Sequence, residues 1–333
     1  MSKHLFGQTR KGRQIVITLC ILVSGAAASS VQAAQEFPVR PLRMVVPLAP
    51  GGGSDIVGRM VAGALSDEWR QTVVVDNRPG AGSTVGTGIA AKAAPDGYTL
   101  MVSSSSMAIT PALRKNLDFD ILRDFSAVSL LASQPSILAV HPSLKAGSLK
   151  ELVALAKARP GQLSFASAGP ASATHLGTEL FLHAAGIRML HVPYKSAGQA
   201  TTALLSGETQ VLLTNMASML PHVKAGRVRA LGVSSAQRSG LAKELPTLAE
   251  AGLAGFEYAT WYGMVVPRGV PGPVLDRIYS AVSRSMAKPA LQERFSRQGL
   301  SIHASSPVVF RRYLQDEVMK WRAVVTAARL AVQ

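Results

Sequence analysis

Short apolar runs alternate with amphipathic segments from Leu42 onward. Leu42–Val46 favours a strand, and apolar positions from Ile56 to Trp69 then recur at the three- and four-residue spacing of a helix. A further strand is predicted at Thr72–Val75, a helix at Thr84–Ala93 and another strand at Tyr98–Val102. Strand–loop–helix units repeated at this spacing predict an α/β architecture with mostly parallel sheets.

The alternation continues to the C-terminus. The final helix is marked by Ser306 as N-cap and Pro307 at its first position, with apolar residues from Phe310 to Val325 on one face. No Gly/Ser-rich or Pro-rich linker separates the halves of the chain, so we expect two α/β lobes between which the chain crosses more than once. Further strands are expected at Ile137–Val140, Leu163–Ala166, Met189–Val192, Val211–Leu213 and Ala230–Val233, and further helices at Ser148–Ala158, after the Ser167–Thr174 loop and from Ala200.

Residues 1–33 have the pattern of a secretory signal peptide. Four basic side chains precede an apolar run from Ile15 to Val23, and small residues follow as far as Ala33. The run is nine residues long, whereas a membrane span needs ~20 strongly apolar residues, so a membrane anchor is not expected. We predict export and cleavage after Ala33, with Val31 at the −3 position. Lipidation at Cys20 is disfavoured because this residue lies inside the apolar run.

Removal of the leader changes the composition in two ways. The full chain of 333 residues has a net charge of +16 and one cysteine, whereas residues 34–333 are 300 residues with a net charge of +12 and no cysteine. A disulfide framework and a cysteine-based metal site are thereby excluded. With 47% hydrophobic and 16% charged residues the chain is not of the disordered class, and its length favours two domains.

Glycine- and serine-rich loops between predicted strands and helices are the candidates for a binding site. Glycines in Ala49–Asp55 let a ligand approach the backbone, and the free amides of the following helix attract anions. An ordinary turn capped by Ser54 explains this loop equally well. Ser167 and Ser172 belong to a similar loop, and Ser103–Ser106 follows a predicted strand at the end where α/β folds bind ligands.

Signatures of an enzyme are weak. The sequence has no Gly-x-Ser-x-Gly elbow for a serine nucleophile, and His175, His183 and His191 are eight residues apart, which suits no metal site on a helix. Gly80–Gly86 reads Gly-x-Gly-x-x-x-Gly, and no acidic residue follows at the distance that a dinucleotide site requires. We predict no catalytic residue, no metal and no cofactor, and we keep a secreted hydrolase that uses the serine loops as an alternative.

The positive charge is dispersed along the chain. Arg227 with Arg229, and Arg311 with Arg312, are close pairs, but no basic block, helix-turn-helix signature or aromatic–basic motif occurs. We therefore expect no nucleic acid partner. A diffuse positive potential that attracts anionic ligands is the simpler interpretation.

Eight short motifs, in order, resemble the Bug/TctC-type periplasmic solute-binding proteins of tripartite tricarboxylate transporters. The resemblance runs from near Phe37 to the C-terminus. The motifs are Pro41–Pro47 with Ala49–Asp55, Val75–Gly82, Ala94–Leu100, His175–Leu176, His191–Lys195, Leu220–Gly226, Pro246–Gly252 and Trp261–Gly263.

This resemblance implies an α/β, two-lobed periplasmic binding protein of type II, a Venus flytrap, with two crossover strands near Ile137–Val140 and Met264–Val266. Residues 38–138 plus 265–333 would form the first lobe, and residues 139–264 the second. The resemblance also implies a monomer in the periplasm whose partners are membrane permease subunits. A sensor that feeds a membrane signalling partner is the alternative role.

A small carboxylate would be held in the interlobe cleft, largely through backbone amides. Carried over by position, the Ala49–Asp55 and Ser167–His175 loops are the carboxylate clamps, and Ser103–Ser105 and the Thr214–Asn215 turn line the cleft. The ligand-binding residues that the resemblance implies are Ala49, Gly52, Gly53, Ser54, Asp55, Ser103, Ser104, Ser105, Ser167, Ala171, Ser172, Thr174, His175, Thr214 and Asn215.

Departures from the family pattern bear on the ligand. Thr214 stands where many members have an Asp that pairs with an amino group, which disfavours amino acids. Pro170 and Ala171 replace an Asn-Gly pair, and Pro170 has no amide to donate. Met107 and Thr110 replace a polar His and Asn, which makes that wall more apolar. We therefore hypothesise a mono- or dicarboxylate with an apolar or aromatic body.

Overall fold

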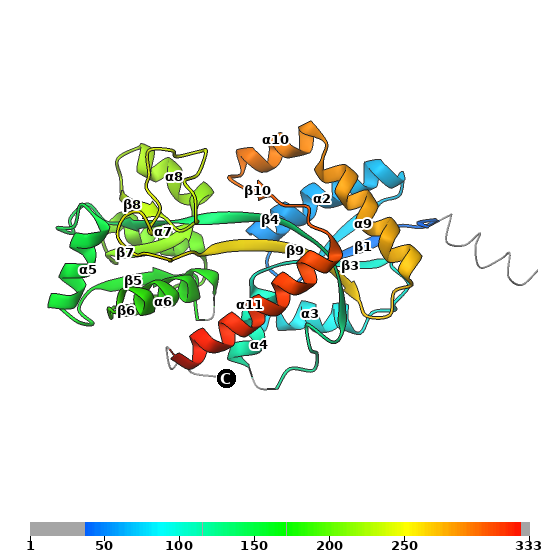
Figure 1. Cartoon of the computed structure of the whole chain (residues 1–333), viewed down its shortest axis with the longest axis horizontal. Coiled ribbons are helices and arrows are strands. Elements are labelled where there is room, and N and C mark those ends of the chain that lie inside the picture. The colour runs from blue at the N-terminus through cyan, green and yellow to red at the C-terminus, as the bar shows by residue number, and fades with distance from the viewer. Residues whose placement is uncertain (1–36, 115, 171, 328–333) are drawn as a thin grey trace, which may run out of the picture.

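Two long strands run side by side through the molecule and join its two lobes (Figure 1). In this computed structural model, which describes residues 37–114, 116–170 and 172–327, the strands are β4, Phe125–Val140, and β9, Ala259–Pro267. Nearly all of their side chains are buried, as is typical of strands that are covered on both faces. The predicted leader, with Cys20 and Ala33, lies outside the described residues.

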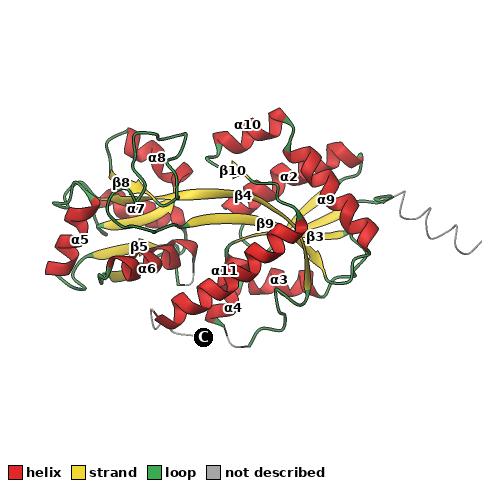
Figure 2. Cartoon of the chain, viewed as in Figure 1, coloured by secondary structure: helices red, strands yellow, loops and turns green. Residues whose placement is uncertain are grey.

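The first lobe is built on a sheet in the order β2-β1-β3-β9-β4, with β10 paired to β4. Strands β1, β2 and β3 are parallel, as the repeated strand–helix units predict, whereas β9 is antiparallel to both β3 and β4. Helices cover both faces of this sheet (Figure 2). The strands are β1 Leu42–Val46, β2 Val73–Asn77, β3 Thr99–Ser104 and β10 Ser301–Ile302, and the helices are α2 Gly53–Trp69, η1 Ala81–Ser83, α3 Thr84–Ala91, α4 Ser106–Leu113, α9 Gly272–Met286, α10 Pro289–Arg297 and α11 Pro307–Ala327.

The second lobe continues from the far end of β4. Its sheet has the order β4-β7-β5-β6, and β8 also pairs with β4. Strands β5, β6 and β7 are parallel to one another, whereas β4 is antiparallel to β7 and β8. The strands are β5 Ser164–Ser167, β6 Leu190–Pro193, β7 Val211–Asn215 and β8 Arg229–Val233, and the helices are α5 Leu149–Ala158, α6 Ala173–Ala185, α7 Ala197–Ser206 and α8 Met216–Lys224.

The chain passes from one lobe to the other near Pro135 and returns near Tyr258. Strand β4 pairs with β9 as far as Pro135 and with β7 from Ser136 onward. On the return, the amide of Tyr258 donates to the carbonyl of Ser234 in the second lobe, and the next residue, Ala259, begins β9. The two passages therefore lie side by side, since Pro135 is opposite Ala259 in the β4–β9 ladder.

Both passages come earlier in the chain than the sequence indicates. The predicted crossover stretch Ile137–Val140 lies in β4 but already pairs within the second sheet, and Met264–Val266 lies in β9 within the first sheet. Both stretches are continuously apolar, and such runs mark a buried strand without marking where it changes neighbours. The lobe boundaries at 138/139 and 264/265 stay a prediction.

Successive side chains of β4 enter different hydrophobic cores. Leu138 and Val140 belong to a core cluster that has members in both lobes, whereas Ile137 and Ala139 belong to a cluster within the second lobe. This alternation follows from the two-residue period of a strand. A third cluster, within the first lobe, fills the space under α2, α9 and α10.

A buried carboxylate on helix α11 accepts a hydrogen bond from the crossover strand β9. The helix begins at Pro307 with Ser306 accepting from the amide of Val309, as the sequence predicts. Nearly three turns further on, Glu317 accepts hydrogen bonds from the indole of Trp261 on β9 at 2.8 Å and from that of Trp321 at 3.1 Å. None of the helices in the described part of the chain is both long and apolar enough to cross a bilayer.

We predict that Gly263→Ala destabilises the protein by about 1–3 kcal/mol, because overpacking forces side chains or backbone to shift. A Cβ atom at Gly263 of β9 would lie 2.1 Å from Cζ of Phe310, which anchors α11 in the shared core. Gly272→Ala is the control, since a Cβ at Gly272 has no described atom within 4 Å. Urea denaturation would measure both, and equal free energies of unfolding for the two variants would contradict this packing.

Candidate functional site

A cavity of about 390 Å³ lies between the two lobes. The loop before α2, the strand β9 and the α10–β10 turn contribute residues from the first lobe. The beginnings of α7 and α8 contribute residues from the second lobe. The cavity is therefore bounded by elements that reach it from both sides of the crossover strands.

The N-termini of α2, α7 and α8 all face this cavity. Gly51–Gly53 lead into α2, Ala197 and Gly198 begin α7, and Asn215 is the N-cap residue of α8. The first amides of a helix have no acceptor within the helix and carry the positive end of its dipole. Both lobes thus direct partial positive charge into the cavity, which suits an anionic group.

The described side chains that line the cavity are neutral. Gln134, Tyr262 and Gln298 provide polar groups on the side of the first lobe, and Ile56 and Leu300 provide apolar surface there. No Lys or Arg is among the described lining residues. An anion held here would consequently be stabilised by backbone amides and neutral donors rather than by a counter-ion.

Tyr262 fits against the start of α2 so closely that no side chain larger than hydrogen is tolerated at Gly53. A Cβ atom there would lie 2.1 Å from the Tyr262 hydroxyl oxygen. Tyr262 is buried, and burial raises the pKa of its phenol, so the hydroxyl stays protonated as a donor. Its neighbour Thr260 donates to Oδ1 of Asn215 at 3.3 Å, which links β9 to the start of α8 in the second lobe.

The Ala49–Asp55 loop is closed by Asp55 rather than by Ser54. Helix α2 already begins at Gly53, so the expectation that Ser54 is its N-cap is wrong. The carboxylate of Asp55 accepts from the amide of Gly51 at 2.9 Å and from Arg59 at 3.0 Å. Burial raises the pKa of Asp55, but these hydrogen bonds outweigh it and the net pKa is lowered.

The buried hydroxyls of Ser54, at the start of α2, and Ser105, after β3, have no hydrogen-bond partner among the described residues. Ser103 and Ser104 close β3, and both side chains lie near the Ser106 hydroxyl. All three serines that were expected to line the cleft, Ser103–Ser105, are buried in the structure as it stands. They lie beside the crossover, because Ser104 is opposite Tyr262 in the β3–β9 ladder.

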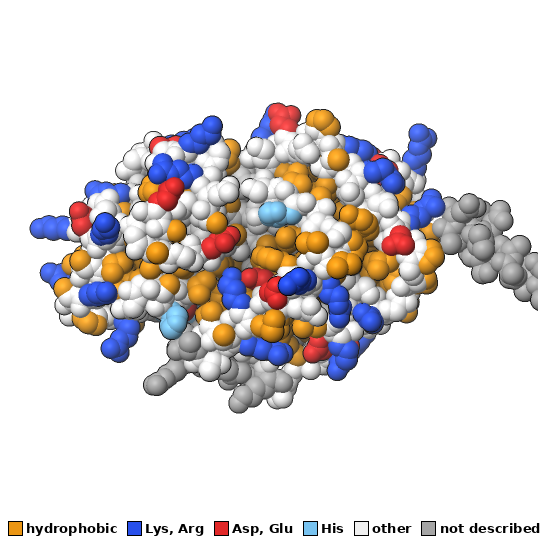
Figure 3. Space-filling view, viewed as in Figure 1, with side chains coloured by type: hydrophobic (Ala, Val, Ile, Leu, Met, Phe, Trp, Pro, Cys, Tyr) orange, Lys and Arg blue, Asp and Glu red, His pale blue; other side chains and the backbone are white. Residues whose placement is uncertain are grey.

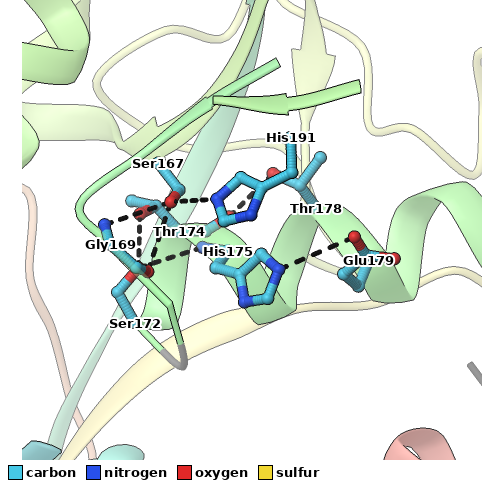
Figure 4. Close-up of polar contacts among 8 residues, drawn as sticks. All are labelled: Ser167, Gly169, Ser172, Thr174, His175, Thr178, Glu179 and His191. Carbon is cyan, nitrogen blue, oxygen red and sulfur yellow. Dashed lines mark hydrogen bonds and ion pairs between the residues drawn. The ribbon is translucent and has the colours of Figure 1, made fainter. Parts of the chain in front are cut away.

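The Ser167–His175 loop is held together by its own polar side chains (Figure 4). Ser167 bonds to Nε2 of His191 at 2.6 Å, and Ser172 caps α6 by accepting from the amide of His175. Thr174 accepts from the amide of Ala168, which ties the two ends of the loop together. Ala171 lies outside the described residues.

The rings of His175 and His191 stack in the same region. Their centroids are 4.0 Å apart, and Phe165 stacks against both rings, at 4.9 Å from His191 and 6.3 Å from His175. Burial lowers the pKa of His175 to about 4, with a smaller contribution from His191, and it also lowers the pKa of His191. The contact of 3.7 Å between His175 and Glu179 therefore involves a neutral imidazole at neutral pH.

Two groups can be distinguished among the predicted residues. Gly52, Gly53 and Asn215 line the cavity, and Thr214 lies buried one position before Asn215. Ser167, Ser172, Thr174 and His175 form the self-contained loop described above, and Ala49 is exposed.

Part of the cavity lining is not predicted from the sequence. The missed residues include Gln134, Ala197, Gly198 and Gln298. Ser196 followed by small residues is a start signal for α7, and its side chain indeed accepts from the amide of Gln199.

Comparison with known proteins gives a consistent result. The family model described as "Tripartite tricarboxylate transporter family receptor" matches residues 57–330. Protein BugT of Bordetella pertussis is 35% identical over 321 residues, which is 95% of this chain and 98% of that protein.

Two solved structures are similar along nearly their whole length. Rpa4515 of Rhodopseudomonas palustris with adipate is 30% identical with a TM-score of 0.80, covering 88% of this chain and 98% of the other. MatC (Rpa3494) from the same organism, with bound malate, is 30% identical with a TM-score of 0.77, covering 87% and 100%.

We predict opposite effects for two substitutions in α2. Gly53→Ala should destabilise the protein, because the added methyl group takes the place of the Tyr262 hydroxyl. Gly63→Ala should stabilise it by about 0.5–1 kcal/mol, since Gly63 is an exposed helix position with no described atom within 4 Å of its Cβ. Thermal unfolding of both variants measures the difference, and a stable Gly53→Ala protein would contradict the close approach of Tyr262.

We also predict that acid weakens the fold through the stacked histidines. The unfolded chain takes up a proton at His175 below pH 6.5, whereas the folded protein does so near 4, so the free energy of unfolding falls as the pH falls through this window. The loss from His175 amounts to at most about 3 kcal/mol. Burial raises the pKa of Glu179, which offsets part of this loss.

Urea unfolding across the same pH window measures the effect. His175→Gln should flatten the pH dependence of the free energy of unfolding. His183→Gln, at an exposed position of the same helix, should keep the wild-type slope. If both variants keep that slope, the histidine stack does not account for acid sensitivity.

Proposed function

The chain belongs to the tripartite tricarboxylate transporter receptor family, as the eight motifs predict, and from this premise we propose that it captures a small carboxylate between its lobes and delivers it to membrane permease subunits. Members of this family are periplasmic solute-binding proteins. The convergence of the α2, α7 and α8 N-termini on one interlobe cavity is the observation that carries the proposal.

The physical basis is the replacement of water by oriented backbone dipoles. Each helix N-terminus stabilises a nearby negative charge by roughly 0.3–1 kcal/mol at an exposed site and by more where the geometry is partly buried. Three such termini, from two lobes, compensate for the absence of a cationic side chain among the described lining residues. Closure of the lobes strengthens these interactions further by removing water.

The ligand that we propose is a mono- or dicarboxylate with an apolar body. Adipate and malate, which accompany the two related structures, are small dicarboxylates. Ile56 and Leu300 provide apolar wall to the cavity, and its volume of about 390 Å³ accommodates a ligand of that size. The Ser167–His175 loop and Ser103–Ser105 remain candidates for contacts with the carboxylate when the cleft closes.

An alternative enzymatic role is suggested by the hydrogen bond of 2.6 Å between Ser167 and His191. A serine nucleophile must be reached by its substrate and activated by a poised base. Ser167 is fully buried, and burial lowers the pKa of His191, so this pair stabilises the loop. Solute binding is therefore the better supported function.

Export is part of the proposal. A signal peptide of residues 1–33, cleaved after Ala33, would deliver the protein to the compartment in which its family works. Lys and Arg side chains are spread over both lobes on the face drawn in Figure 3. Such a dispersed field raises the local concentration of anions without competing for them at the cavity.

We predict that isothermal titration calorimetry of the mature protein detects binding of adipate, malate or a similar carboxylate with a dissociation constant of ~10 µM or below. Adipamide, the neutral counterpart of adipate, should not bind, because the helix N-termini select for negative charge. The proposal would be contradicted if the protein bound only amino acids tightly, or if it bound adipamide as strongly as adipate.

We further predict that this binding is only weakly sensitive to salt. Raising the sodium chloride concentration from about 0.02 M to about 0.5 M should weaken the affinity by less than about threefold, since buried dipoles are screened far less than surface charges. Calorimetric titrations at both concentrations test this. A loss of affinity by orders of magnitude would indicate that surface Lys and Arg hold the ligand instead.

A further inference from the structure

The turn between α10 and β10 is built by a helix-terminating motif centred on Gly299. The amide of Gly299 donates to the carbonyl of Ser296 at 2.8 Å, and the amide of Leu300 donates to that of Phe295 at 3.0 Å. This is the Schellman arrangement, in which the residue after the C-cap adopts a left-handed conformation. Gly299 has φ +67°, so the motif by itself explains a glycine or an asparagine here.

This first-lobe turn also touches the second lobe. A Cβ atom at Gly299 would lie 3.2 Å from Cδ1 of Leu241, 3.4 Å from Nε2 of Gln134 and 3.8 Å from Cβ of Ala217. Leu241 and Ala217 belong to the second lobe. Gln298 and Leu300, on either side of Gly299, line the interlobe cavity together with Ala217. The turn therefore closes one end of the cavity by bridging between the lobes.

The same turn is tied to the crossover strand. Nε2 of Gln134 donates to the carbonyl of Gln298 at 2.7 Å, and Gln134 is 5% exposed. Gln134 immediately precedes Pro135, the last residue of β4 that pairs within the first lobe. A change in the angle between the lobes at this point therefore changes the distance between the turn and the second lobe.

We propose that the Gln298–Leu300 turn is a latch that seats against Ala217 and Leu241 when the lobes close over a ligand, and that Gly299 is the positioning residue that permits this seating. The inference rests on the proposed function, because closure has its meaning in the capture of a carboxylate. It adds a contact outside the loops that the sequence assigned to ligand binding. The absence of a side chain at position 299 then sets how far the cleft closes.

The first test separates the two reasons for a glycine at position 299. Asparagine is compatible with the left-handed conformation, so Gly299→Asn keeps the helix end but drives a side chain toward Leu241. Gly226→Asn is the matched control. Gly226 ends α8 with the same pair of hydrogen bonds and the same φ of +67°, but no described atom lies within 4 Å of its Cβ.

For Gly299→Asn we expect adipate or malate to bind about tenfold more weakly than to the Gly226→Asn protein, with both variants equally stable to heat. The double variant Gly299→Asn with Leu241→Ala should regain most of the affinity, since the alanine makes room for the asparagine. Equal affinities of the Gly299→Asn and Gly226→Asn proteins would overturn the latch.

A second test locks the latch covalently. The separation of 3.8 Å between Cβ of Ala217 and the Cβ position at Gly299 equals the mean Cβ separation in disulfides, about 3.8 Å. In the mature protein, which has no cysteine, and with Leu241→Ala to make room for a side chain at position 299, the pair Ala217→Cys with Gly299→Cys should form a disulfide on treatment with diamide. The oxidised protein should release preloaded adipate or malate at least ~100-fold more slowly, and reduction should restore release. Ala217→Cys with Gly226→Cys is the control and should form no such bond.

The two tests distinguish failure of the latch from failure of the proposed function. If the wild-type protein binds no carboxylate, the proposed function is wrong, and the latch is then judged by the disulfide yield alone. If no disulfide forms between positions 217 and 299, the interlobe contact is overturned. Release of carboxylate at the wild-type rate from the oxidised protein would overturn its role in closure.

Discussion

The antiparallel pairing of β4 with β9 is the constraint on which the architecture depends. The two strands run together from Phe125 to Pro135, and all other described strands of both lobes attach to this pair directly or through one or two intervening strands. Because both passages between the lobes occur at one end of this ladder, beside Pro135, the two backbone connections between the lobes lie next to each other. Relative movement of the lobes is concentrated where the strand pairing changes, which is a hinge geometry.

The cores determine on which side this hinge opens. One hydrophobic cluster is continuous between the lobes and includes Phe125 of β4, Trp261 of β9 and Phe165 of β5. On the opposite face the lobes have separate clusters, and the cavity lies there, bordered by Tyr262 and Leu300 of the first-lobe cluster. Opening on this face exposes neutral polar and small residues. Opening on the opposite face would separate the packed side chains of the shared core, which costs a free energy of about 25 cal/mol per Å² of apolar surface exposed.

Much of the fold follows from the alternation of strands and helices in the sequence, because parallel units leave a regular hydrophobic pattern. Details that depend on distant residues do not. Ser54 has the right chemistry for an N-cap, but Asp55 closes the loop through Gly51 and Arg59, and the helix begins earlier. Likewise, position 53 requires glycine because the hydroxyl of Tyr262, far away in the sequence, occupies the space that a Cβ atom would need. The local sequence does not show this.

Electrostatic effects in this molecule are of two kinds, a long-range field from Lys and Arg side chains and short-range hydrogen bonding by backbone amides. Most of the described acidic groups with a shifted pKa pair with Arg or Lys near the surface, as Glu68 does with Arg284 and Lys288, while the excess of positive charge is distributed over both lobes. That field is long-ranged and indifferent to the shape of the anion. Within the cavity the described lining is neutral, and backbone amides act at hydrogen-bond distance. If the cavity binds a carboxylate as proposed, selection among carboxylates depends on their fit to the closed cavity, and the net charge raises the rate at which they arrive.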